Sequence, residues 1–189
     1  MCVTGAISCL NMPAYLEALR SNRPDVSTTV ILSKSATRMI SPTALSLFAQ
    51  EVIGPSDDDL QWNRTNHVRL GSEAALVVIA PATASRLSRL ARGDGDDLIG
   101  LIALSHPRPL LIFPSMNRAM WGNVAVVRNR DTLVSDGHVV SRHEARCLEV
   151  LSGARELAPA MPPPQDWAAL LTAHIDERTD RRPHDHADR

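Results

Sequence analysis

Apolar residues follow two alternating patterns along the chain. Short, branched runs have the length and composition of buried strands, and they lie at residues 2–8, 28–32, 75–79, 110–113 and 137–140. Apolar residues spaced every three or four positions indicate helices, at residues 15–19, 68–74, 86–91, 124–133 and 165–175, with another helix opening at 96–99. This alternation predicts a doubly wound α/β domain with a mainly parallel sheet, of the Rossmann or flavodoxin-like class.

The length and composition indicate one domain. The chain has 189 residues, of which 44% are hydrophobic, and this is enough for one well-buried core but short for two. We expect the domain to span residues 1–177. Residues 178–189 are polar apart from one alanine, and we expect them to form a disordered tail.

Charge and hydropathy exclude two kinds of partner. The formal net charge is −1 and arginines are scattered, so we expect neither nucleic acid nor a membrane surface as a partner. No apolar run approaches the ~20 residues that span a bilayer. The N-terminus also lacks the basic and apolar regions of a signal peptide, so the expected location is the cytoplasm.

Cysteine spacing argues against a disulfide framework and against a zinc site. Cys2, Cys9 and Cys147 are odd in number and lack Cys-x-x-Cys spacing. The consecutive carboxylates at 57–59 do not alternate as a calcium loop requires. We therefore expect reduced thiols and no metal.

Small and hydroxyl-bearing residues follow the first two predicted strands. Such turns let backbone N–H groups approach a ligand, and a helix dipole behind them favours phosphate. Ordinary strand-to-helix turns and helix caps also use these residue types. The candidate residues are Gly5, Ala6, Ile7 and Ser8 in the first turn, and Ser33 and Ser35 in the second.

His67 precedes the predicted helix at 68–74 and the strand at 75–79. Because an imidazole titrates near neutrality, it is suited to act as a general base. A capping or surface role is the ordinary alternative for a single histidine.

The segment at 114–121 leaves the end of the predicted strand at 110–113. In an open parallel sheet, ligands bind outside the carboxyl ends of the strands, where the amide of Asn117 could reach a carboxylate. Capping of the following helix is the simpler explanation of Asn117.

Five positions of this segment resemble a known signature. Pro114, Met116, Asn117, Met120 and Trp121 reproduce the pattern Pro-x-Met-Asn-x-x-Met-Trp of the homo-oligomeric flavin-containing cysteine decarboxylases. Residues 81–86, followed by Asp-Asp-Leu at 96–98, resemble the second signature of this family, Pro-Ala-Ser-Ala-Asn-Thr. Thr83 replaces Ser conservatively, whereas Ser85 stands for Asn and Arg86 for Thr.

The resemblance implies a flavin, FMN or alternatively FAD, bound between the subunits of a homotrimer, with a dodecamer as the higher assembly. His67 would be the base and Asn117 would hold the substrate carboxylate, and the implied substrate contacts also include Met120, Ser152 and Gly153. The implied flavin contacts are the two turns named above and Pro81, Ala82, Thr83, Ala84, Ser85 and Phe113.

Two branches of the family differ in their last step. The clamp segment at 148–153 resembles that of the peptidyl-cysteine decarboxylases of lanthipeptide biosynthesis, which convert the C-terminal cysteine of a precursor peptide to an aminoenethiol. The alternative is a phosphopantothenoylcysteine decarboxylase of coenzyme A biosynthesis, in which Cys147 would be the clamp cysteine. A flavin-binding regulatory subunit and a flavin prenyltransferase are further alternatives.

Overall fold

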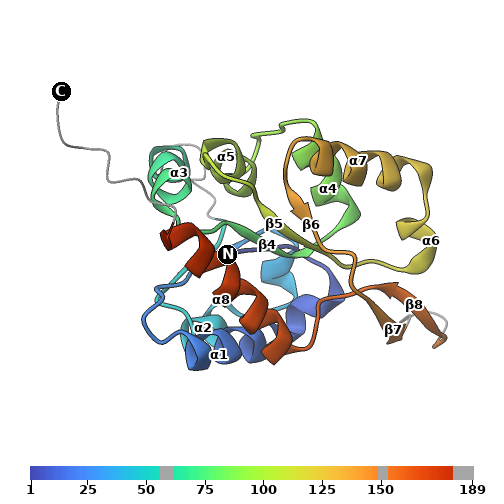
Figure 1. The fold of residues 1–189 in the computed structure, drawn as a ribbon, viewed down its shortest axis with the longest axis horizontal. Helices are drawn as coiled ribbons and strands as arrows, with labels where there is room; N and C mark the ends of the chain where they lie inside the picture. The colour runs from blue at the N-terminus through green and yellow to red at the C-terminus, as the bar shows by residue number, and fades with distance from the viewer. Residues whose placement is uncertain (56–61, 149–152, 181–189) are drawn as a thin grey trace.

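A parallel sheet of six strands forms the centre of the molecule (Figure 1). The computed structural model describes residues 1–55, 62–148 and 153–180. The strands stand in the order β3-β2-β1-β4-β5-β6, and every pair is parallel. They are β1 (Cys2–Val3), β2 (Thr29–Leu32), β3 (Glu51–Ile53), β4 (Val78–Ala82), β5 (Leu111–Pro114) and β6 (Val139–Val140). The predicted doubly wound fold is confirmed.

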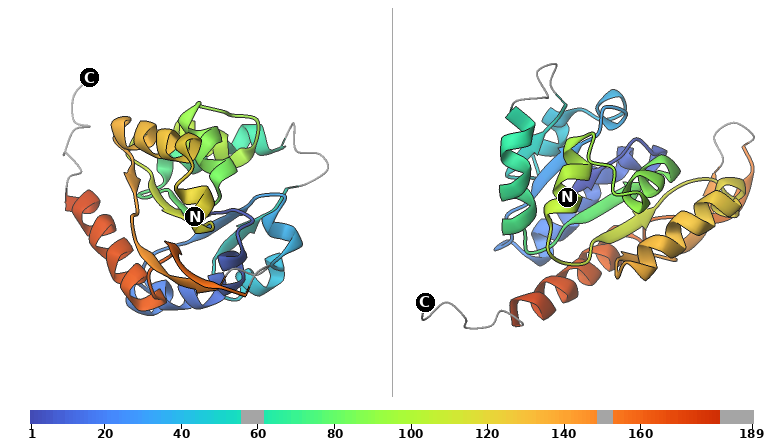
Figure 2. Two further views of the ribbon diagram at one scale, coloured as in Figure 1. Left: turned by 90° about the vertical axis from the view of Figure 1, so that its right-hand side faces the viewer. Right: turned by 90° about the horizontal axis from the view of Figure 1, so that it is seen from above.

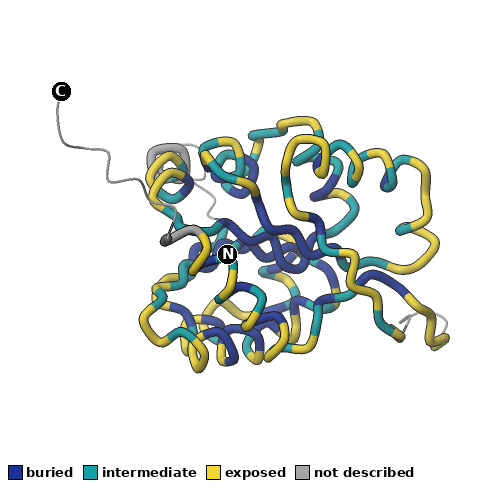
Figure 3. Tube along the Cα trace, viewed as in Figure 1, coloured by how far each residue is buried: buried dark blue, intermediate teal, exposed yellow. Residues whose placement is uncertain are grey.

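Helices cover both faces of the sheet, which explains why its central strands are apolar throughout. One face packs against α1 (Met12–Asn22), α2 (Pro42–Ser46) and α8 (Pro164–Asp180). The other packs against α3 (Trp62–Glu73), α4 (Ala84–Ala91), α5 (Leu98–Ser105) and α7 (Val124–Ser135). Every residue of β4 and β5 is buried, and exposed residues lie mainly on the outer helices and loops (Figure 3).

Alternate residues of each strand serve the two cores. Phe113 faces α8, where its ring centroid lies 6.0 Å from that of Trp167. Trp167 also meets Tyr15 of α1 edge-on at 5.3 Å. The neighbouring residue Ile112 belongs to the other core, with Leu87 of α4. This period of two fixes the register of the sheet.

Several elements differ from the predicted ones. β3 was not predicted because it has three residues at a sheet edge and only Ile53 is buried, so it leaves no apolar run. The predicted first strand ends at Val3, and the chain then turns into a short 3₁₀ helix, η1 (Ile7–Asn11). A second 3₁₀ helix, η2 (Ala36–Arg38), follows β2.

An antiparallel hairpin extends from the end of the molecule at which α6 (Arg118–Trp121) lies (Figure 1, Figure 2). Its strands are β7 (Glu144–Leu148) and β8 (Arg155–Pro159), with Cys147 opposite Glu156. These strands were not predicted, because charged and apolar residues are mixed in them and leave no apolar run. The hairpin leads into α8, which runs to Asp180, so the first three residues of the expected tail are helical.

Among the described residues, no helix is long and apolar enough to cross a membrane. Most of the predicted clamp segment lies outside the described part of the chain, because residues 149–152 are not described. The same holds for residues 181–189 of the expected tail.

Candidate active site

The strand order places the topological switch point of the sheet between β1 and β4. The chain continues outward from β1 through β2 to β3, and from β4 through β5 to β6, so the connections diverge at this point. Ligands of open α/β sheets bind outside the carboxyl ends of the strands at such a switch point. The segments that leave β1, β2, β4 and β5 are those in which the sequence places the flavin and substrate residues.

Thr4 joins the first and third of these segments. Its buried hydroxyl donates to the Pro81 carbonyl at 2.7 Å and accepts from the Thr83 N–H at 3.1 Å. The turn after β1 and the end of β4 are therefore held by one side chain. Sequence reasoning missed Thr4, because a threonine at the end of a strand carries no distinctive pattern.

The turn after β1, which contains Gly5, contacts the turn after β2, which contains Ser33 and Ser35. A Cβ atom added at Gly5 would lie 2.5 Å from Ser35 Cβ, so only glycine allows this approach. The hydroxyls of Ser33 and Ser35 are 3.1 Å apart, and Ser33 Oγ also accepts from the Ala36 N–H at 3.2 Å. The exposed Ser35 hydroxyl can face a phosphate.

The remaining residues of the first turn differ in exposure. Ala6 is buried, Ile7 is exposed, and Ser8 is half-buried. The Ser8 hydroxyl donates to Ser115 Oγ at 2.8 Å, which connects the turn after β1 to the turn after β5. The Ser115 N–H in turn donates to the Ala82 carbonyl at 2.9 Å.

The third segment exposes only part of its predicted set. β4 continues to Ala82, so the side chains of Pro81 and Ala82 are buried in the sheet. Thr83 caps α4, and its Oγ1 accepts from the Arg86 N–H at 3.2 Å. Thr83 and Ala84 are half-buried and Ser85 is exposed, so these three side chains are available to a ligand at this edge. Phe113, by contrast, has its ring in the core beside Trp167.

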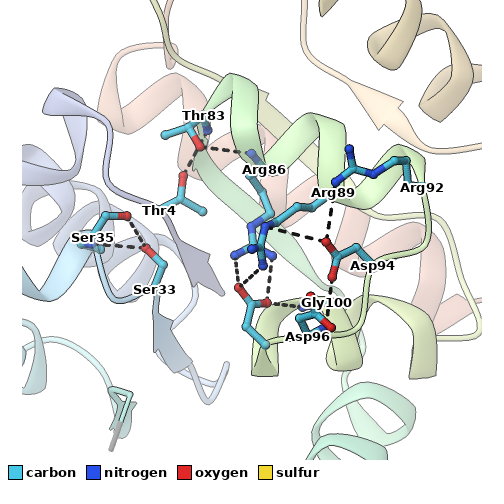
Figure 4. Close-up of polar contacts among 12 residues, drawn as sticks. Thr4, Ser33, Ser35, Thr83, Arg86, Arg89, Arg92, Asp94, Asp96 and Gly100 are labelled. Atoms are coloured by element: carbon cyan, nitrogen blue, oxygen red, sulfur yellow. Dashed lines mark hydrogen bonds and ion pairs between the residues drawn. The ribbon is translucent and has the colours of Figure 1, made fainter.

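Arg86 departs from the family signature, and the structure shows what it contacts (Figure 4). Its side chain is 5% exposed and forms two hydrogen bonds with the Asp97 carboxylate, one of them 2.9 Å long. Asp97 also caps α5 by accepting from the Gly100 N–H at 2.9 Å. One ion pair thus joins the two parts of the second signature, at 81–86 and 96–98.

This ion pair also sets the ionisation of Asp97. Burial acts to raise the pKa of its carboxyl, but the hydrogen bonds from Arg86 and from the Gly100 N–H outweigh burial. The pKa of Asp97 is therefore lowered from its ordinary value. Arg89 adds a second, longer ion pair at 3.5 Å.

Asn117 has the capping role that was the simpler explanation for it. It is the N-cap of α6, and its Oδ1 accepts from the Met120 N–H at 2.8 Å. The cap fixes the orientation of the amide, which leaves the Nδ2 donors free on an exposed residue. Met120, which is 44% exposed, lies on the same turn. Capping and carboxylate binding are compatible.

His67 lies within α3 rather than ahead of a helix. It is half-buried, and its Nδ1 is buried without a hydrogen-bond partner among the described residues. α3 and α6 lie on opposite sides of the molecule in Figure 1. One chain therefore does not bring His67 to Asn117.

The substrate clamp is described only in part. Ser152 lies outside the described residues, whereas Gly153 is exposed and has a φ of +68°, the left-handed region that favours glycine. Cys147 is half-buried on β7. Within the described ranges, no group of three or more His, Cys, Asp or Glu residues could hold a metal ion.

A cavity of about 470 Å³ lies at the other edge of the sheet. Its lining includes Met1, Thr29 and Val77, which stand at the amino ends of β1, β2 and β4. None of the predicted site residues is among the residues that line it. The cavity is therefore separate from the switch point, which lies at the carboxyl ends of β1 and β4.

Comparison with known proteins agrees with this geometry. The model of the flavoprotein family matches residues 1–174. The chain belongs to the flavoprotein family. Within that family, mersacidin decarboxylase from a Bacillus species is 30% identical over 178 residues, covering 94% of this chain and 90% of the relative. The coenzyme A biosynthesis bifunctional protein CoaBC of Escherichia coli is 32% identical over 139 residues, which are 73% of this flavoprotein and 34% of CoaBC.

Solved structures share the fold of this flavoprotein. Peptidyl-cysteine decarboxylase EpiD has a TM-score of 0.75 at 25% identity, covering 92% of this chain and 95% of that chain. An EpiD complex with the substrate peptide DSYTC gives a TM-score of 0.76 at 25% identity, with the same coverage. The FMN-dependent cysteine decarboxylase TvaF has a TM-score of 0.67 at 33% identity, covering 75% of this chain and 87% of that chain.

Proposed function

We propose that this flavoprotein catalyses the flavin-dependent oxidative decarboxylation of the C-terminal cysteine of a ribosomally made precursor peptide. The product is an aminoenethiol, as in lanthipeptide-type natural product biosynthesis. One observation carries the proposal: the Asn117 amide is oriented by its own cap, with its donors free at the carboxyl edge of the sheet. A substrate carboxylate matches those donors.

FMN is the proposed cofactor. Gly5 has no side chain and lies close to Ser35, so backbone and hydroxyl groups of the two turns lie close together. Such groups can donate hydrogen bonds to a phosphate. Thr83, Ala84 and Ser85 lie at the same edge for contact with the ring and ribityl chain. The related decarboxylase TvaF is FMN-dependent. FAD is the alternative cofactor.

Bound flavin supplies the two-electron oxidation of the cysteine side chain to a thioaldehyde. Asn117 holds the carboxylate, and the thioaldehyde sulfur accepts the electron pair left when carbon dioxide departs. His67 is the proposed base for the thiol proton, and its side chain is only half-buried in α3. The net change is loss of carbon dioxide and two hydrogens.

We further propose a homotrimer, with a dodecamer as the larger assembly. The support is the separation of α3 from α6, because His67 and Asn117 can serve one reaction only if they come from different chains. Sedimentation of the flavin-loaded protein measures the assembly. A monomer that is fully active would contradict it.

The coenzyme A branch is the second candidate, and similarity to CoaBC over 73% of the chain supports it. In that branch Cys147 would act in the last step. It lies half-buried opposite Glu156 in the hairpin. Cys147→Ser separates the branches, since it abolishes turnover only if the product is the reduced thiol.

A pair of peptides tests the proposed function. The holoprotein is incubated with a peptide ending in a free-acid cysteine and with the same peptide carrying a C-terminal amide. We expect only the free acid to lose carbon dioxide and two hydrogens, because the amide has no departing carboxylate. Equal inertness of both peptides would reject the proposal.

A further inference from the structure

Helix α6 contacts the core through its last residue, Trp121. The helix is a single turn, Arg118–Trp121, and none of its residues is fully buried. Trp121 is half-buried and packs against the core on the side of α4, α5 and α7. The cap of this turn is Asn117, the residue whose position the proposed reaction depends on, and polar contacts of Trp121 add to its packing.

Two elements hold the Trp121 indole. Its Nε1–H donates to Glu144 Oε1 of β7 at 3.1 Å. The guanidinium carbon of Arg130, on α7, lies 5.2 Å from the ring centroid. The negative face of the ring meets a cation and its polar edge meets a carboxylate, so both contacts follow the charge distribution of an indole.

Arg130 is itself held in place. Its Nε donates to Asp131 Oδ1 at 2.9 Å, and its side chain is only 19% exposed. The cation over the ring is therefore positioned independently of α6. Glu144 is exposed, and among the described residues its hydrogen bond with Nε1 is the one that joins the indole to the hairpin.

Holding Trp121 also holds Asn117. The Trp121 N–H donates to the Asn117 carbonyl at 3.0 Å, and the Met120 N–H donates to Asn117 Oδ1 at 2.8 Å. These bonds make the turn one unit. A displacement of the indole would therefore be carried to the amide donors of Asn117.

We propose that Glu144 is a positioning residue that sets the Asn117 amide for the substrate carboxylate through the Trp121 indole. The inference rests on the proposed function and adds to it a link between the hairpin and the carboxylate site. Arg130 supports the same ring from α7. Glu144 does not touch the substrate in this account.

A spectroscopic experiment tests the contact without turnover. The holoprotein is labelled with 5-fluorotryptophan, and the Trp121 signal is assigned as the one lost in Trp121→Phe. Glu144→Ala should move that signal and leave those of Trp62 and Trp167 in place. Glu156→Ala is the matched control, because it removes an exposed carboxylate from the other strand of the same hairpin.

Kinetics test the positioning role. Glu144→Ala should raise KM for the cysteine peptide about three- to tenfold, the scale of one net hydrogen bond, with kcat changed by less than about twofold. Glu144→Gln keeps an acceptor oxygen and should restore KM. Trp121→Phe should have the same effect as Glu144→Ala, and the double variant should add nothing.

Each outcome decides the inference. An unmoved Trp121 signal, an unchanged KM in Glu144→Ala, or additive effects in the double variant would overturn it. If the wild-type protein converts no peptide, the proposed function fails. Calorimetric titration of the peptide then replaces KM, and equal affinities of the wild type and Glu144→Ala would overturn the inference separately.

Discussion

Gly5 packs directly against Ser35, so that a Cβ at Gly5 would lie 2.5 Å from Ser35 Cβ and 2.9 Å from its carbonyl carbon. The turns after β1 and β2 meet only because residue 5 lacks a side chain. This contact shapes the edge at which we place the flavin phosphate.

Gly5→Ala should therefore separate the two turns and weaken flavin binding by at least about tenfold, the effect of losing one or two hydrogen bonds to a charged group. The measurement is flavin retained after gel filtration, with affinity by titration of the apoprotein. Gly54→Ala is the control, because a Cβ at residue 54 would lie at an ordinary contact distance, 3.6 Å, from its nearest neighbour, Thr37 Cγ2. Equal flavin affinity in Gly5→Ala and wild type would place the phosphate elsewhere.

Asn117→Asp isolates the amide donors from the cap. Asp is as good an N-cap as Asn, so α6 should persist and flavin should stay bound. The carboxylate would repel the substrate carboxylate in addition to losing the donor, so kcat/KM should fall by more than the ~0.5–1.5 kcal/mol of an ordinary hydrogen bond. Asn123→Asp is a matched control, because Asn123 caps the next helix through Oδ1 at 2.9 Å from the Ala125 N–H. A wild-type rate in Asn117→Asp would mean that another group holds the carboxylate.

His67→Asn should keep flavin and assembly while slowing decarboxylation by about 10²-fold or more, the scale of a lost general base. Unfolding and reassembling it together with Asn117→Asp tests whether the site spans two chains. A mixed oligomer contains some sites with both native residues, so activity should return. Two inactive proteins that stay inactive when mixed would argue for a site within one chain.

Acid should weaken the link between α4 and α5. The folded-state pKa of Asp97 lies below its ordinary value in the unfolded chain, so the ion pair contributes its full stability above that ordinary value, and the contribution is lost as pH falls through the folded pKa. Asp97→Asn should cost about 2 kcal/mol at pH 7, less than a fully buried pair because the carboxylate is partly exposed. The cost should shrink below about pH 4. Urea unfolding across pH measures it, with the exposed Asp96→Asn as control; a cost independent of pH would contradict the account.

The sequence predicted most of the sheet, because buried parallel strands are continuous apolar runs. It also placed Asn117 correctly at a strand end, since Pro114 marks where β5 stops. β3 and the hairpin were not predicted, because a three-residue strand and partly polar strands leave no such run. Phe113 was expected beside the flavin, yet alternation along β5 turns its ring toward Trp167.

Contacts between distant segments could not be predicted from one sequence. Thr4 meets Thr83, and Arg86 meets Asp97, only after the strands are ordered. Trp121 was recognised by its signature, but its partner Glu144 lies on a strand that no pattern indicated. Such pairs depend on the fold rather than on local spacing.

Mass spectrometry of the products formed from two alternative substrates tests the central claim most directly. The flavin-loaded protein is offered a peptide with a C-terminal cysteine and, separately, phosphopantothenoylcysteine. We expect the peptide to lose carbon dioxide and two hydrogens, and the small thiol to react much more slowly. Conversion of phosphopantothenoylcysteine alone, with loss of carbon dioxide only, would contradict the account.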